Sequence, residues 1–145
     1  MKRTFSTILG IVCMTLTVLM VSCQSKPVKQ SQYSNQIIGK WECTYEKQIS
    51  TGGTVTENNP NYIAEFSSGG KYREIWPAEV GGVVNEATWS IDGTNISLVF
   101  DELTYNGKIE KLTDKQLIIN YSIYVEQNDA GGYVQVHGEY EKKDD

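Results

Sequence analysis

Apolar and polar residues alternate at every second position through most of the chain between residues 37 and 143. Because successive side chains of a β-strand point to opposite faces, a period of two predicts strands with one buried face. No long stretch shows the 3.6-residue period of an amphipathic helix. We therefore predict an all-β domain that must cover its apolar faces without the help of helices.

The alternation predicts eight strands. The sixth covers roughly Tyr105 to Leu112. The inward residues of the other seven are Trp41, Cys43 and Tyr45; Tyr62, Ala64 and Phe66; Tyr72 and Trp76; Ala87, Trp89 and Ile91; Ile96, Leu98 and Phe100; Leu117, Ile119, Tyr121 and Ile123; and Val134, Val136 and Tyr140. Short turns join most of them, and one longer loop runs from Ser50 to Asn61. Since Ile109 and Leu112 cannot share a face at period two, we expect a β-bulge there.

Two hairpins predict their own registers. If Ile91 lies opposite Ile96 across the Asp92–Asn95 turn, Trp89 lies opposite Leu98 on the same face. In the last hairpin one register gives the inward pairs Ile123–Val134, Tyr121–Val136 and Leu117–Tyr140, and the outward pairs Tyr124–Tyr133 and Asn120–His137. Sequential hairpins with one apolar face favour closure over a sandwich, because a barrel has no exposed edge. The predicted fold is an eight-stranded antiparallel up-and-down β-barrel.

The N-terminus predicts export. Lys2 and Arg3 precede an apolar run from Ile8 to Val21 that has the length of a secretory signal rather than of a membrane span. A retained transmembrane anchor is the alternative, which the threonines and serines in and before the run weaken. Residues 19–23, LMVSC, resemble the lipobox of bacterial lipoproteins, which implies that the signal (1–22) is removed and that Cys23 carries acyl chains such as palmitate.

The expected organisation is therefore a flexible, Gln- and Ser-rich tether at 23–36 and one domain at 37–145. Gln24 rather than Asp after the cysteine resembles lipoproteins sorted to the outer membrane, so we expect an anchor there, with the domain on the periplasmic side. Without Lys2 and Arg3 the mature chain has 11 basic and 18 acidic residues, a net charge of −7. Nucleic acid is a poor partner for such a domain.

Catalytic chemistry has little support in the sequence. His137 is the one histidine, on a predicted outer face, and Cys43 is the one thiol left outside the signal and the lipobox, on a predicted inner face. A general base needs a pocket and a partner, and no metal-type cysteine spacing, phosphate loop or nucleophile elbow is present. We expect no cofactor, no metal and no enzymatic activity.

Four segments together resemble a known family, the small lipocalin-like domains of Gram-negative lipoproteins. Residues 39–41, GKW, resemble the G-x-W signature of lipocalins, and residues 66–72, 88–93 and 109–117 resemble the later strands. The resemblance implies a barrel with Trp41 at the closed end and the Ser50–Asn61 loop beside an open mouth. It also implies a late cation against Trp41, where lipocalins have arginine and this chain offers Lys142 or Lys143.

The inward aromatic residues are the candidate ligand-binding set. They are Trp41, Tyr62, Tyr72, Trp76, Trp89 and Tyr121. They could line an apolar pocket or simply fill a small barrel, and filling is the simpler interpretation because the side chains are large. Glu74 also points inward by alternation, so it either lines a wet cavity that could hold a polar ligand group or is turned outward by a bulge near Pro77. A bulge or a position at the rim is the simpler interpretation, because a lone buried carboxylate is costly.

Two functions remain open at this point. One is a lipid-anchored envelope lipoprotein whose barrel binds a small apolar ligand. The other is a non-catalytic structural or protein-interaction module with a filled barrel, which Ile118, Tyr124 and Tyr133 on the predicted outer face would serve.

Overall fold

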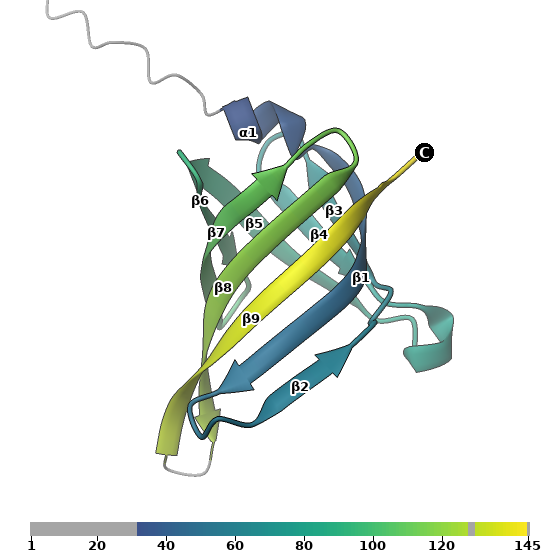
Figure 1. The fold of residues 1–145 in the computed structure, drawn as a ribbon. Coiled ribbons are helices and arrows are strands. Elements are labelled where there is room, and N and C mark those ends of the chain that lie inside the picture. Colours follow the sequence, from purple (N-terminus) through teal and green to yellow (C-terminus); the bar gives the residue numbers. More distant parts are fainter. Residues whose placement is uncertain (1–31, 128–129, 145) are drawn as a thin grey trace, which may run out of the picture.

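The computed structural model describes residues 32–127 and 130–144 as a single closed sheet with one short helix (Figure 1). The predicted signal peptide, Cys23 and most of the predicted tether lie outside the described residues. The elements are α1 (Gln32–Gln36), β1 (Gly39–Ser50), β2 (Val55–Asn58), β3 (Ile63–Ser67), β4 (Lys71–Ile75), the 3-10 turn η1 (Ala78–Val80), β5 (Val84–Asp92), β6 (Asn95–Val99), β7 (Thr104–Leu112), β8 (Gln116–Gln127) and β9 (Ala130–Lys143).

The sheet closes into an eight-stranded antiparallel barrel, which confirms the predicted fold class. Strands β3 to β9 pair in sequence order, and β9 returns to pair with β1 from Lys40–Lys143 to Ser50–Val134. β2 does not add a ninth strand to the closed barrel. It pairs with the second half of β1, and β3 pairs with the first half, so β2 and β3 share one position beside the same long strand.

The predicted registers of the two hairpins are confirmed. Ile91 pairs with Ile96 and Trp89 with Leu98 in the β5–β6 hairpin. In the β8–β9 hairpin Leu117 pairs with Tyr140, and the other four predicted pairs are also present. The expected bulge lies in β7, where the register with β8 shifts between Ile109 and Lys111 and brings both Ile109 and Leu112 into the core.

One prediction for the first strand is wrong. The register between β1 and β9 shifts between Cys43 and Tyr45, so a second bulge reverses the faces of the strand. Tyr45 therefore lies on the outer face, where its ring contacts that of His137 edge-on at 6.4 Å. Glu46, which strict alternation puts outside, lies inside and is 8% exposed. A bulge adds one residue to one strand, and this is enough to exchange inside and outside.

The predicted loop from Ser50 to Asn61 is also wrong in part, because it contains β2. A turn at 51–54 reverses the chain, and Val55–Asn58 then pairs with Glu46–Ile49. The chain passes from β2 to β3 through Asn61, whose φ of 53° is in the left-handed region that asparagine tolerates. The break lies beside the bulge in β1, since Asn61 N donates to Cys43 O and Cys43 N donates to Tyr62 O.

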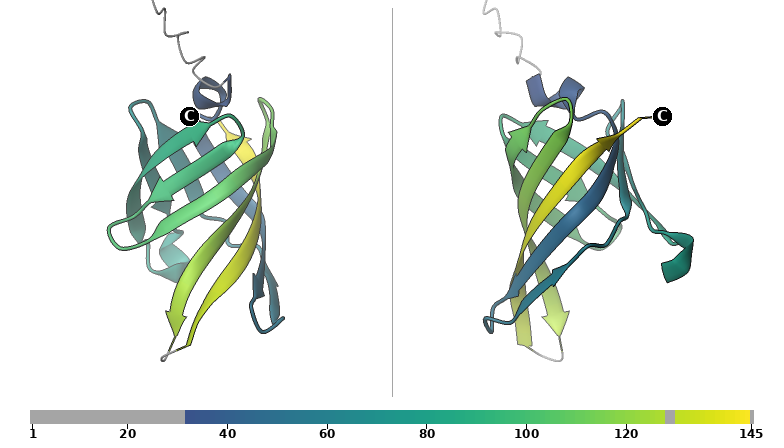
Figure 2. Two further views of the ribbon diagram at one scale, coloured as in Figure 1. Left: turned by 90° about the vertical axis from the view of Figure 1, so that its left-hand side faces the viewer. Right: turned by 45° about the vertical axis from the view of Figure 1, so that its right-hand side comes forward.

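The two ends of the barrel differ. At one end lie α1, the C-terminus and the turns after β3, β5 and β7 (Figure 1). The helix falls within the predicted tether, where no sequence pattern indicated it. Ser34 is buried and Tyr33 packs against the core. At the other end β1, β8 and β9 extend beyond the shorter strands β4 to β7 (Figure 2). The first end is closed and the second is open.

Candidate ligand-binding site

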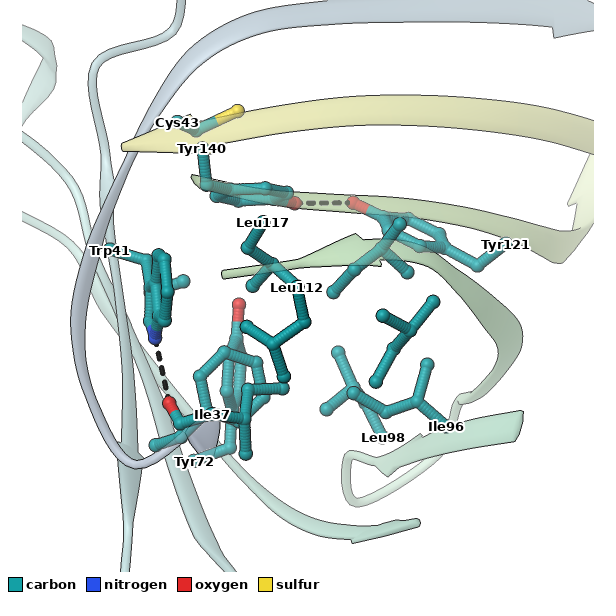
Figure 3. Close-up of a cluster of buried hydrophobic side chains, with 14 of the residues drawn as sticks. Ile37, Trp41, Cys43, Tyr72, Ile96, Leu98, Leu112, Leu117, Tyr121 and Tyr140 are labelled. Atoms are coloured by element: carbon teal, nitrogen blue, oxygen red, sulfur yellow. Dashed lines mark hydrogen bonds between the residues drawn. The ribbon is translucent and has the colours of Figure 1, made fainter. Parts of the chain in front are cut away.

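The closed end of the barrel is filled by apolar side chains around Trp41. Trp41 has no exposed surface, and its Nε1 donates a hydrogen bond of 2.7 Å to Ile37 O just after α1 (Figure 3). Lys142 Nζ lies 4.3 Å from the centroid of the Trp41 ring and donates to Ile38 O at 2.6 Å. The expected late cation is therefore Lys142. Trp41 acts as a plug and is not accessible to a ligand.

Aromatic rings form a continuous series around the interior. Consecutive ring centroids lie 4.8–6.2 Å apart, a distance at which aromatic pairs attract each other. Tyr121 and Tyr140 are also neighbours in the series, but they are connected by a hydrogen bond of 3.2 Å between their hydroxyl groups rather than by a ring contact. The series runs through Trp89, Phe66, Tyr72, Phe100, Tyr105, Tyr121, Tyr140, Tyr62 and Trp76.

Three tyrosine hydroxyls meet inside the barrel. Tyr140 Oη lies 2.9 Å from Tyr62 Oη and 3.2 Å from Tyr121 Oη, so one hydroxyl bridges two others. Figure 3 shows the bond between Tyr140 and Tyr121. Burial raises the pKa of all three phenols, which therefore stay neutral. Cys43 lies beside them, and burial raises its thiol pKa to about 12. A thiol that stays protonated is not a nucleophile at neutral pH.

Glu74 lies inside the open half. The pairing of β4 with β3 and β5 shows no register shift, so no bulge turns Glu74 outward. Its Oε1 accepts hydrogen bonds from Trp76 Nε1 at 2.6 Å and from Asn85 Nδ2 at 3.1 Å. The side chain is half-buried. Of the two arrangements that the sequence left open, the structure has the one in which Glu74 faces the interior.

Glu46 is a second interior carboxylate, which sequence reasoning missed. The bulge in β1 brings it inside, where Gln48 Nε2 donates to its Oε1 at 2.7 Å. Burial is the main cause that raises the pKa of the Glu46 carboxyl; the bond from Gln48 opposes this, and the charge of Glu74 adds to it. The charges of the two carboxylates therefore interact, and both charges also help to raise the pKa of the Tyr105 phenol. No pattern in residues 41–50 signals the reversal of faces.

A hollow of about 1260 Å³ lies at the open end beside these groups. Phe100, Tyr105 and Ile123 contribute aromatic and aliphatic surface to it, and Asn85 contributes the amide that binds Glu74. Its other lining residues are Arg73, Val84, Glu86, Asp101, Glu102, Leu103, Tyr124 and Val125. Arg73 and Tyr124 belong to the outer face of the sheet, so the hollow continues over the rim of the barrel. The hollow is open to solvent and has at least as much polar as apolar surface, so it suits a ligand with both an apolar body and a polar group.

The structure brings four of the seven predicted site residues together and separates three. Tyr62, Trp76 and Tyr121 belong to the aromatic series toward the open half, and Glu74 bonds to Trp76. Tyr72 pairs with Phe66, which pairs with Gly39 at the start of β1, so Tyr72 lies toward the closed end. Trp41 lies in the plug. Trp89 lies near the closed end, where its Nε1 donates to Ser67 O at 3.0 Å. Sequence reasoning placed Phe100 and Tyr140 inside but did not select them, and it assigned Tyr105 to a strand without assigning its face.

Other chemistry is limited in the part of the chain that the structure describes. His137 lies on the outer face as predicted, with Nδ1 2.6 Å from Asn120 Oδ1 and Nε2 3.3 Å from Glu139 Oε1. Residues 32–127 and 130–144 contain no group of three His, Cys, Asp or Glu side chains placed to hold a metal ion. Among the described helices, none has the length and apolarity needed to span a bilayer.

Comparisons with known proteins agree with this architecture. The sequence model of a family described as the lipocalin-like domain matches residues 37–119. A crystal structure of an uncharacterized protein from Bacteroides eggerthii is similar in fold, with a TM-score of 0.50 and 12% identity over 73% of this chain and 98% of the other. A search of curated proteins gave no match. At 12% identity the likeness concerns the fold alone.

The buried Glu46 predicts how the stability of the barrel depends on pH. Because its pKa is raised on folding, the folded chain binds the proton more tightly than the unfolded chain, and stability increases as pH falls through the window above the ordinary value of 4.5. Glu46→Gln removes the ionised group. We expect the variant to melt above the wild type at pH 8 and this difference to shrink toward pH 4, measured by circular dichroism.

Glu110→Gln is the matched control, because it removes the same charge from an exposed position on β7. A Glu46→Gln variant that melts below the wild type at pH 8, or that gains no more at pH 8 than at pH 4, would contradict the assigned position of Glu46.

Proposed function

The chain belongs to the lipocalin-like domain family, and on this basis we propose that it is a lipid-anchored envelope protein whose barrel binds a small, largely apolar ligand at its open end. The observation that carries the proposal is the difference between the two halves of the interior. Trp41 and its neighbours fill the closed half, whereas Phe100, Tyr105 and Ile123 in the open half line a hollow of about 1260 Å³. A barrel that served only as a rigid body would gain stability from filling both halves.

Binding rather than catalysis fits the groups at this site. Its buried phenols and thiol stay neutral at physiological pH, so they can donate and accept hydrogen bonds but supply no nucleophile. His137 lies on the outer face and cannot act as a general base in the interior. We therefore propose a protein without enzymatic activity.

The proposed anchor is consistent with the end of the barrel at which the described chain begins. The described chain begins with α1 at the closed end, so a short segment from Cys23 to residue 31 would attach the membrane on that side. The open end would then face away from the bilayer, toward the solvent of the periplasm. Several acyl chains on Cys23, each buried CH₂ contributing about 0.8 kcal/mol, would make the attachment permanent. We propose the outer membrane as its site.

Binding at the open end predicts a change in tryptophan fluorescence. Trp76 bonds to Glu74 and contacts Tyr62 at a ring distance of 4.8 Å, so a ligand there changes its surroundings. We expect 1-decanol, a neutral apolar probe, to give a saturable change in emission from residues 24–145. Trp76→Phe should remove most of the change and Trp89→Phe should retain it. If Trp76→Phe behaves like the wild type, the ligand binds elsewhere; if the wild type shows no saturable change, the barrel does not bind such molecules.

The lipid anchor predicts a change in fractionation. The wild type expressed in a Gram-negative host should incorporate labelled palmitate and enter the detergent phase of a two-phase extraction. Cys23→Ser should abolish the label, because no thiol remains to accept the diacylglyceryl group, while Cys43→Ser should retain it because that thiol is buried. Equal labelling of the wild type and Cys23→Ser would exclude Cys23 as the acceptor.

One observation favours a second candidate, a protein-interaction surface on the last hairpin. Tyr124 and Tyr133 lie opposite each other on the outer face, 49% and 59% exposed, with their rings packed edge-on at 5.3 Å. Exposed aromatic pairs are common in the central parts of protein interfaces. The predicted third member, Ile118, is half-buried.

This second candidate predicts that Tyr124→Ser with Tyr133→Ser removes a partner in a pull-down from envelope extracts. Because the two rings contact mainly each other outside the barrel, the free energy of unfolding should fall by no more than about 1.5 kcal/mol. Lys108→Ser, elsewhere on the outer face, controls for a general surface effect. A partner that survives the double change would exclude this surface as its binding site.

A further inference from the structure

The open half of the interior carries negative charge. Glu46 and Glu74 are the two carboxylates inside it, close enough to act on each other and on Tyr105. Three more acidic residues, Glu86, Asp101 and Glu102, line the adjoining hollow. A ligand that enters the hollow therefore meets carboxylates at the rim, and Glu74, half-buried and bonded to the lining residue Asn85, lies next to it.

Positive side chains that could balance these charges are directed elsewhere. Arg73 is the one basic residue among those that line the hollow, and it is bound by Glu65 at 3.3 Å and Glu86 at 3.8 Å. Lys47 pairs with Glu57 at 3.1 Å on the outer face, and Lys142 lies over Trp41 at the closed end. The described residues thus offer no lysine to the hollow.

We propose that the ligand of the open end is a cationic amphiphile, that is, a small molecule with an alkyl or aromatic body and one ammonium head group, which binds between the interior carboxylates and the aromatic rings. This inference rests on the proposed ligand-binding function and specifies its ligand class. It excludes long-chain fatty acids, whose apolar body fits the same hollow but whose head group carries the opposite charge.

The groups around Glu74 suit an ammonium head. Among the described residues, both hydrogen bonds to Glu74 end on Oε1, which leaves Oε2 to accept a hydrogen bond from a ligand. The ring of Trp76, which is only partly buried, lies beside this carboxylate, and the faces of such rings attract cations. An ion pair inside a partly desolvated site is stronger than one in water.

The apolar part of such a ligand has a separate place. Phe100, Tyr105 and Ile123 line the hollow next to Asn85, which holds Glu74, and Val84, Leu103 and Val125 continue the apolar surface toward the rim. The head group would therefore lie deeper in the barrel than the body. In this orientation the body covers the ion pair from water, which further favours the interaction between opposite charges.

Three probes of equal length test this inference: decylammonium, 1-decanol and decanoate at pH 7.5 and low ionic strength. Isothermal titration calorimetry on residues 24–145, which include every described element, measures each dissociation constant. We expect decylammonium to bind at least tenfold more tightly than decanoate, with decanol between them. Glu74→Gln should reduce the ratio of the decanoate to the decylammonium dissociation constant at least threefold, while the dissociation constant of decanol stays within twofold of the wild-type value. Glu110→Gln, the control at an exposed position, should leave the ratio within twofold of the wild type.

Each other outcome contradicts a defined part of the account. Decanoate that binds as tightly as decylammonium would overturn the cationic ligand class and leave apolar ligand binding in place. A preference for decylammonium that Glu74→Gln and Glu46→Gln both leave unchanged would also overturn it, because the preference would then come from the net charge of the surface. Absence of binding by all three probes would overturn the proposed function itself.

Discussion

The pairing of β1 with β9 is the constraint on which the rest of the structure depends. It joins the first and last strands of the domain over most of the length of β1, from Lys40 with Lys143 to Ser50 with Val134. Without it the chain would be an open, curved sheet with two free edges and an uncovered apolar face. With it, the inward side chains of eight strands meet in a space just wide enough for them, and a continuous series of aromatic rings can form.

Unequal strand lengths and one bulge divide that space into two halves with different chemistry. The closed half holds Trp41, sealed by its bond to Ile37 and by Lys142, and it stabilises the fold. The open half is bounded on one side by the long strands β8, β9 and β1 and on the other by short strands, which leaves the hollow. The bulge after Cys43 turns Tyr45 to the outer face and brings Glu46 into the interior. A bulge can re-aim a side chain at a functional site, and here it supplies a buried carboxylate.

The sequence predicted the features of the fold that depend on strict alternation of apolar and polar residues, or on a break in this alternation that the residue spacing reveals. The pairing of Trp89 with Leu98 follows from one turn and one apolar face, and the bulge in β7 follows because Ile109 and Leu112 are three residues apart. The bulge in β1 leaves no such trace, because alternation continues on both sides of it. β2, with the residues VTEN, has no buried face that could produce a pattern. The hollow could not be predicted, since it depends on where strands end in space.

The central claim is that the open half holds a small molecule, and native mass spectrometry tests it most directly. Residues 26–145 would be secreted into a bacterial periplasm, purified without detergent and sprayed under native and denaturing conditions. The account predicts a reproducible added mass that is lost on denaturation, with a formula that contains a basic nitrogen. The bare polypeptide mass under both conditions, unchanged by added apolar amines, alcohols or fatty acids, would contradict it and would mean that side chains alone fill the barrel.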